Sequence, residues 1–209
     1  MKKGKFITFE GPDGSGKTTV SKAVCERLVQ LGYPVRYSRE PGGSKIAEQI
    51  RDIILDPKNT DMDPKCEALL YAASRRQHLT DIVIPALESG THVICDRFVD
   101  SSAAYQGYAR GIGADEVLAM NAFAIGDLMP EKTIFLDIPA ETGIERIQKN
   151  HRAADRLDSE GMEFHRRVYE GYREVMKKAG ERMIVIDASR DPETVIREAF
   201  EAVKEILNG

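Results

Sequence analysis

Short apolar runs alternate along the chain with longer stretches in which apolar residues recur every three or four positions. A continuous apolar run of this kind is typical of a buried strand, and the wider spacing is typical of an amphipathic helix. The runs predict five strands, at 6–9, 35–37, 92–95, 133–136 and 183–186. Helical spacing follows the first run, covers the regions around 46–54 and 64–89, and returns in the last segment.

The clearest helix signal lies near the end of the chain. Asp191 suits the N-cap and Pro192 the first helical position, and Val195, Ala199 and Val203 then share one face. Short apolar strands that alternate with amphipathic helices predict an α/β fold, a doubly wound five-stranded parallel sheet flanked by helices. The chain has no internal repeat or linker, so we expect one domain over residues 1–209, with ligands beyond the carboxyl ends of the strands.

Composition narrows the class of protein. Thirty Lys and Arg residues oppose 34 Asp and Glu residues, and this slightly acidic balance predicts no nucleic acid and no membrane among the partners. The three cysteines form no CxxC pair, which argues against a disulfide framework or a zinc site. The apolar run after the basic N-terminus is too short for a signal segment, and no run approaches the roughly 20 residues of a membrane span. We therefore expect a cytoplasmic protein.

Residues 11–18 carry the strongest chemical signal. They read Gly-Pro-Asp-Gly-Ser-Gly-Lys-Thr, which fits the pattern GxxxxGK[ST] between a predicted strand and a predicted helix. Backbone N–H groups in such a loop surround phosphate, Lys17 reaches the β- and γ-phosphates, and the Thr18 hydroxyl binds Mg²⁺. The pattern therefore predicts a P-loop NTPase fold that binds ATP and Mg²⁺.

Two aspartates accompany this phosphate loop. A carboxylate among phosphate-binding amides would repel the ligand, so Asp13 is expected to point outward, toward a sugar hydroxyl or a Mg²⁺-bound water. The alternative is that it only shapes the turn. Asp96 ends an apolar strand and is the natural acid to contact Mg²⁺ directly or through water, although it could instead cap a helix.

A second set of charged residues indicates a second anion. Six arginines lie in loops after strands or on the helical segments between them, a concentration suited to clamping another phosphate, although each could be a solvated surface charge: Arg39, Arg51, Arg75, Arg76, Arg97 and Arg110.

With these motifs in place, the chain resembles the bacterial thymidylate kinases over nearly its whole length. The segments that carry the resemblance are 9–19 (Phe-Glu-Gly-Pro-Asp-Gly-Ser-Gly-Lys-Thr-Thr), 39–43 (Arg-Glu-Pro-Gly-Gly), 69–76 (Leu-Leu-Tyr-Ala-Ala-Ser-Arg-Arg), 96–98 (Asp-Arg-Phe) and 101–107 (Ser-Ser-Ala-Ala-Tyr-Gln-Gly). The first identifies a superfamily, and the others together identify the thymidylate branch.

The resemblance implies residue roles at the acceptor site. Tyr71 stands where the family usually has a Phe that stacks on thymine, Arg75 matches an arginine that donates to a thymine carbonyl, and Ser102 and Gln106 match groups that read the opposite pyrimidine edge. Arg39, Arg51 and Arg97 match ligands of the acceptor phosphate. Glu40 matches an acid near the metal, and Asp13 one near the sugar 3′ position. Phe98 replaces a Tyr found in many relatives.

The resemblance also implies a donor site and a mobile LID. The LID would cover about 150–158, and because the phosphate loop contains no arginine, Arg152 and Arg156 are expected to stabilise charge in the transition state. Arg146 would lie against adenine, with 187–189 on the other side. The expected ATP site comprises Gly11, Pro12, Asp13, Gly14, Ser15, Gly16, Lys17, Thr18, Thr19 and Arg146. A homodimer is also implied.

These assignments predict phosphoryl transfer from ATP to dTMP. The acceptor phosphate oxygen is already largely ionised near neutral pH, so no general base is required. The expected catalytic residues are Lys17, Arg97, Arg152, Arg156 and Asp13, which hold two polyanions in line and neutralise charge. Two alternatives remain open: a kinase for uridine or cytidine monophosphate, and a P-loop switch without an acceptor substrate.

Overall fold

The computed structural model describes residues 3–149 and 155–209. A five-stranded, all-parallel sheet forms its centre, in the order β2-β3-β1-β4-β5, which confirms the predicted α/β sheet. The strands are β1 (Phe6–Glu10), β2 (Val35–Arg39), β3 (His92–Asp96), β4 (Lys132–Asp137) and β5 (Met183–Asp187). Each predicted strand corresponds to one of these.

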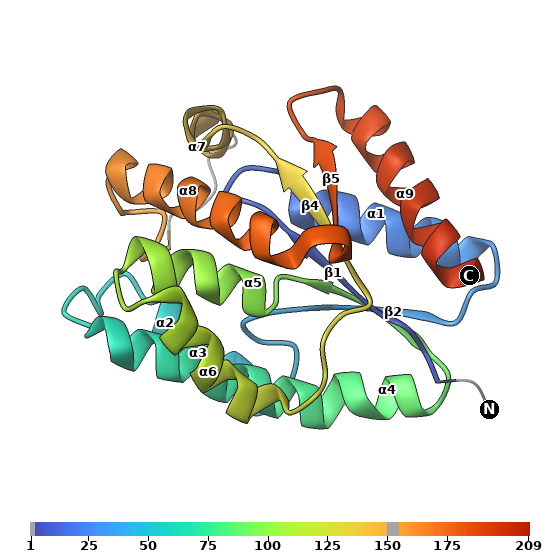
Figure 1. The fold of residues 1–209 in the computed structure, drawn as a ribbon, viewed down its shortest axis with the longest axis horizontal. Coiled ribbons are helices and arrows are strands. Elements are labelled where there is room, and N and C mark those ends of the chain that lie inside the picture. Colours follow the sequence, from blue (N-terminus) through green and yellow to red (C-terminus); the bar gives the residue numbers. More distant parts are fainter. Residues whose placement is uncertain (1–2, 150–154) are drawn as a thin grey trace.

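Helices cover both faces of the sheet (Figure 1). The larger ones are α1 (Lys17–Gln30), α2 (Lys45–Leu55), α3 (Pro64–His78), α6 (Ala114–Ile125), α7 (Ala140–Lys149), α8 (Met162–Ala179) and α9 (Pro192–Asn208). The short ones are α4 (Ile84–Glu88) and α5 (Val99–Ser102). Two π-helical turns, η1 (Leu79–Val83) and η2 (Ala103–Ala109), continue α3 and α5, and a 3₁₀ turn, η3 (Gly180–Arg182), precedes β5.

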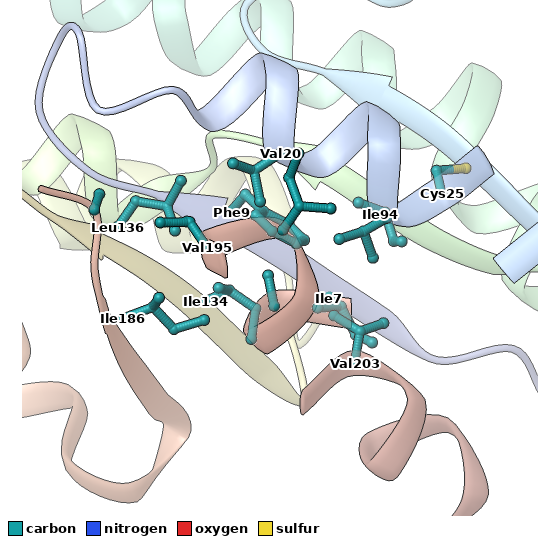
Figure 2. Close-up of a cluster of buried hydrophobic side chains, with 14 of the residues drawn as sticks. Ile7, Phe9, Val20, Cys25, Ile94, Ile134, Leu136, Ile186, Val195 and Val203 are labelled. Carbon is teal, nitrogen blue, oxygen red and sulfur yellow. The ribbon is translucent and has the colours of Figure 1, made fainter. Parts of the chain in front are cut away.

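The alternation of side chains along each strand divides the core between the two faces. Ile7 and Phe9 of β1 point toward α1 and α9, where they pack with apolar residues of the neighbouring strands (Figure 2). Phe6 points the other way and packs among residues of η1, α4 and β3. On that second face, Phe135 of β4 packs against α8 and η2. Because both faces are buried, the strands read as continuous apolar runs.

Local signals explain where the last helix begins. The Asp191 side chain accepts a hydrogen bond from the Thr194 N–H at 3.0 Å, and Pro192 occupies the first helical position, as predicted. Val195, Ala199 and Val203 are buried against the sheet and α1. Within the described residues, no helix combines the length and the apolar character that a membrane span requires.

Candidate active site

The phosphate loop lies between the end of β1 and the start of α1. Gly16 adopts a left-handed conformation (φ 87°) and precedes the helix without a side-chain cap, so the first N–H groups of α1 have no partner within the helix. Gly14 is also left-handed (φ 75°), and a Cβ atom there would lie 2.0 Å from the carbonyl oxygen of Gly143 in α7. The loop is thus a set of backbone donors held against a second helix, which is the geometry of an anion site.

Lys17 is buried at the start of α1 and belongs to this loop. Its ammonium donates to the carbonyl oxygen of Pro12 at 2.7 Å and to Ser15 Oγ at 3.2 Å. Burial and the nearby Arg97 lower the pKa of Lys17 to about 8, even though Asp13 and Asp96 favour the charged form. The Lys17 side chain therefore loses its positive charge as the pH rises through about 8.

Two oxygen donors meet beside the loop. Asp96 ends β3, which neighbours β1 in the sheet with Phe9 opposite Asp96, and the Thr18 hydroxyl donates a hydrogen bond to the Asp96 carboxylate. A hydroxyl and a carboxylate are the oxygen ligands that Mg²⁺ prefers. These two residues fit the predicted metal site.

Asp13 faces away from the backbone donors of the loop. Its carboxylate pairs with the Arg97 guanidinium at 2.5 Å and accepts a hydrogen bond from the Tyr105 hydroxyl at 2.7 Å. Burial alone would raise the pKa of Asp13, but Arg97 and Lys17 outweigh it and the pKa is lowered. The Arg97 guanidinium also donates to Ser101 Oγ and to the hydroxyl of Tyr172, both about 3 Å away. Arg97 therefore lies between the phosphate loop and α8.

A cavity of about 470 Å³ runs from the phosphate loop to a second polar region. Its volume suits small-molecule ligands. Of the predicted site residues in the described part of the chain, Gly11, Pro12 and Arg156 do not line the cavity. Those that do are Asp13, Gly14, Ser15, Gly16, Lys17, Thr18, Thr19, Arg39, Glu40, Arg51, Tyr71, Arg75, Asp96, Arg97, Ser102, Gln106 and Arg146. The structure thus brings residues from the whole chain around one space.

Arg75 is the most buried cation in the second region, with 2% of its surface exposed. Its Nε donates to Glu40 at 2.7 Å, one terminal nitrogen donates to Ser102 Oγ and Asn121, and the other donates to the Phe98 carbonyl oxygen at 3.1 Å. Four of the five guanidinium N–H groups are thereby used, and the fifth has no partner among residues 3–149 and 155–209. Tyr71, one helical turn earlier on α3, lines the same cavity.

Glu40 contacts buried side chains of α3, and its expected place near the metal stays a prediction. One carboxylate oxygen accepts from Arg75, and the other is 2.9 Å from His78 Nδ1, whose Nε2 in turn lies 2.6 Å from Ser38 Oγ. Burial would raise the pKa of Glu40, but Arg75 and His78 lower it. This carboxylate holds the Arg75 guanidinium in place.

Arg39 and Arg51 line the cavity where the resemblance places the acceptor phosphate. The Arg39 guanidinium forms a two-point ion pair with Glu48 at 2.9 and 3.0 Å, and both arginines donate to the Pro41 carbonyl oxygen. Both are only partly buried, so their charge remains accessible from the cavity. Their predicted contact with phosphate stays a prediction.

The predicted donor-base and LID residues have mixed outcomes. Arg146 donates to the Ser189 carbonyl oxygen at 3.4 Å, which brings together the two sides expected to enclose adenine. Arg156 instead turns toward α3, where it pairs with Glu67 at 2.5 Å and donates to the Ile54 carbonyl oxygen at 2.8 Å. The structure therefore gives no support to direct contact between Arg156 and the transferred phosphoryl group. Arg152 and residues 150–154 of the expected LID lie outside the described residues.

Comparisons with known proteins agree with this geometry. Residues 9–199 match the family model for thymidylate kinase. The chain belongs to the thymidylate kinase family. It is 57% identical to the thymidylate kinase of Bacillus velezensis, with 98% of this chain and 97% of that protein covered. The value for the thymidylate kinase of a Geobacillus species is 52%, with 99% of each chain covered. A crystal structure of thymidylate kinase from Ehrlichia chaffeensis superposes with a TM-score of 0.78 at 35% identity, covering 97% of this chain and 99% of that one.

Sequence reasoning missed several residues that support this thymidylate kinase site. Glu10 at the end of β1 accepts hydrogen bonds from the Phe98 N–H, from the Ser101 N–H and hydroxyl, and from the Tyr172 hydroxyl. Burial and the nearby Asp100 raise the pKa of Glu10 to about 7. Glu10 thereby anchors the backbone on either side of Arg97.

Glu67 was missed as well, although a signal was available. Glu67, Tyr71 and Arg75 are spaced four residues apart and therefore share one face of α3. An acid and an arginine on the face of a helix that also carries a candidate base-stacking residue indicate a buried polar network. Gly143 carried no signal, because its role depends on its contact with the phosphate loop in three dimensions.

Proposed function

We propose that this thymidylate kinase uses the 11–19 loop for ATP and the region around Tyr71, Arg75 and Gln106 for dTMP. Phosphorylation of dTMP to dTDP at the expense of ATP is the reaction of the family to which the chain belongs. The observation that carries the residue assignment is the single cavity that joins the phosphate loop to a second, cationic region. A nucleotide switch would need no second region of this kind.

Positioning and charge neutralisation supply the catalysis in this proposal. The attacking oxygen belongs to a phosphate whose second pKa is about 6, so it needs no base. Lys17 and the N–H groups of α1 hold the donor phosphates, and Arg97 stands between that site and the acceptor region. Bound Mg²⁺, held by Thr18 and Asp96, would supply further neutralisation of phosphate charge. Asp13 fixes Arg97 and is proposed to contact the sugar.

A substrate panel tests the assignment. ADP formation from ATP would be followed with dTMP, dUMP, UMP, CMP and dCMP as acceptors, with and without Mg²⁺. We expect the highest kcat/KM with dTMP and almost no turnover without the metal. Faster turnover with UMP or CMP than with dTMP would show that the acceptor is a different nucleotide. Slow ATP hydrolysis that no monophosphate accelerates would favour a nucleotide switch.

We also propose that the chain forms a single domain and that two copies of it form a homodimer through α3 and α6. Apolar residues follow the exposed faces of these two adjacent helices, and Phe123 is 95% exposed and Leu69 58% exposed. Exposed apolar clusters of this kind mark interaction surfaces. Sedimentation analysis tests the proposed dimer. We expect the wild type to sediment as a dimer and Phe123→Asp as a monomer, and a monomeric wild type would contradict the proposal. Action in the cytoplasm stays a prediction from the sequence.

A further inference from the structure

Glu67 is a buried carboxylate that accepts hydrogen bonds from three residues, which come from two segments of the chain. It is 1% exposed and lies on α3. It accepts hydrogen bonds from Gln106 Nε2 at 2.9 Å, from Arg110 Nε and a terminal nitrogen at 3.3 and 3.1 Å, and from Arg156 at 2.5 Å. We call these four residues the Glu67 cluster. None of these hydrogen bonds involves a residue of the phosphate loop, so the cluster needs a separate explanation.

The cluster keeps Glu67 ionised. Burial alone would raise the pKa of this carboxyl, but the hydrogen bond from Gln106 and the charges of Arg110 and Arg156 outweigh burial, and the pKa is lowered. An ionised carboxylate can only accept hydrogen bonds. Whichever end of the Gln106 amide faces it must therefore be the nitrogen, and this fixes the direction of the whole amide group.

The fixed amide leaves one polar atom for the cavity. Gln106 lines the cavity beside Tyr71, Arg75 and Ser102. Its Oε1 makes no hydrogen bond to any residue within 3–149 and 155–209, so it is available as an acceptor. Arg75 keeps one free N–H group, as described above. The pocket thus presents an acceptor and a donor.

This pair of groups distinguishes two kinds of pyrimidine. Thymine and uracil carry an N3–H donor next to a 4-keto acceptor, which complements the Gln106 oxygen and the Arg75 N–H. Cytosine carries an N3 acceptor next to a 4-amino donor, which places acceptor against acceptor and donor against donor. A rotated Gln106 amide would offer a donor in place of an acceptor and would remove half of this discrimination.

We propose that Glu67 is a positioning residue that fixes the Gln106 amide and thereby makes the site prefer a 4-keto over a 4-amino pyrimidine. The inference rests on the proposed use of this region for the acceptor nucleotide. It assigns selectivity to a residue that reaches the base only through Gln106. The same carboxylate also holds Arg156, which lies within the expected LID segment of about 150–158, so the base pocket and Arg156 share one anchor.

The test compares dTMP with 5-methyl-2′-deoxycytidine monophosphate, which differs from dTMP only at positions 3 and 4 of the base. Kd, from calorimetry, and kcat/KM are measured for both nucleotides with the wild type and Glu67→Gln. A neutral glutamine can accept or donate, so the Gln106 amide is free to turn. We expect the preference for dTMP to fall about tenfold or more, the size of effect expected from an unsatisfied buried hydrogen bond. Equal losses for both nucleotides would overturn the proposal.

A double-mutant cycle separates this effect from general damage. In the Gln106→Ala background, Glu67→Gln should change the ratio of the two Kd values by less than about twofold, because the amide that Glu67 orients is gone. The same change in both backgrounds would show that Glu67 acts by another route. Glu88→Gln removes an exposed carboxylate from α4 and is the control for loss of charge.

Two further measurements keep the outcome clear. A wild type that binds dTMP selectively but forms no ADP would contradict the proposed function, whereas the ratio of Kd values would still decide the role of Glu67. If circular dichroism shows that Glu67→Gln does not fold, NMR of the wild type is used to test the proposal instead. The thymine imino proton of bound dTMP should then exchange slowly in the wild type and rapidly in Gln106→Ala, and rapid exchange in both overturns the proposal.

Discussion

The two ends of the cavity present different chemical groups to anions. At the donor end, the loop residues after Pro12 and the start of α1 provide backbone N–H groups, and one lysine completes the site. At the acceptor end, the polar groups are side chains from α2, α3 and η2, and most are already engaged in buried ion pairs such as Arg75 with Glu40. One end depends on the shape of the backbone, and the other depends on a network of side chains.

This difference determines what a substitution does at each end. Backbone donors survive most side-chain changes, so the donor end is sensitive mainly at its lysine and at the glycines that allow close packing. The buried side chains of the acceptor end share partners, and removal of one leaves another charge unsatisfied. We therefore expect losses of activity from changes at the donor end, and losses of stability and selectivity from changes at the acceptor end.

Lys17→Met should cause the largest loss. The ammonium is the only side-chain cation of the loop, and removal of one preorganised group that stabilises developing charge costs about 10²–10³ in rate. Steady-state kinetics with ATP and dTMP would measure kcat and KM. Lys22→Met, on the exposed side of α1, is the matched control and should retain wild-type activity. If kcat of Lys17→Met fell by less than tenfold, the donor phosphates would have to bind elsewhere.

The dependence of kcat/KM for ATP on pH also tests the role of the Lys17 ammonium. Since the pKa of Lys17 in the free enzyme is about 8, kcat/KM for ATP should fall as pH rises above about 8, when the ammonium loses its proton. Lys17→Arg should move this limb to higher pH, because a guanidinium keeps its charge. A wild-type profile that stays flat to pH 10 would contradict the assignment.

The same contrast explains what could be predicted from the sequence. The strands, the last helix and the 11–18 loop were predicted because each depends on contiguous residues with a local periodicity or motif. Asp96 was found because it ends a strand. The partners of Arg75 and Arg156 were not found, because Glu40 and Glu67 lie far from them in sequence. The direction of Arg156 depends on which buried carboxylate it reaches, and no local pattern records that.

Gly143→Ala tests the packing that supports the donor end. A Cβ atom on Gly143 would lie 2.2 Å from the Asp13 carbonyl oxygen, so α7 or the phosphate loop must shift. We expect kcat/KM for ATP to fall by about 10²-fold, since a displacement of about 1 Å in a positioning group can have this effect. Gly161→Ala meets no atom within 4 Å and should behave as the wild type. Unchanged ATP kinetics in Gly143→Ala would mean that the loop is not held by α7.

Arg156→Ala tests whether this arginine of the expected LID has a structural or a catalytic role. Its guanidinium is 7% exposed and is bound by Glu67 and the Ile54 carbonyl oxygen. Loss of one partner of a buried pair should lower the free energy of unfolding by about 3 kcal/mol, measured by urea denaturation. Arg197→Ala, on the exposed face of α9, is the control. A kcat about 10³-fold lower, with unchanged stability and KM for ATP, would return a direct catalytic role to Arg156.

Glu10, which holds the backbone on either side of Arg97, gives the smallest effect. Below pH 4.5 its carboxyl is protonated in the folded and unfolded states, but between 4.5 and about 7 only the unfolded protein releases the proton. Stability from this group is therefore lost as pH rises through about 7. Relative to Glu10→Gln, the wild type should lose on the order of 2 kcal/mol of unfolding free energy between pH 5 and pH 8. Parallel pH profiles for the two proteins would mean that Glu10 is ionised throughout, in which case the four hydrogen bonds that it accepts, and not burial, control its charge.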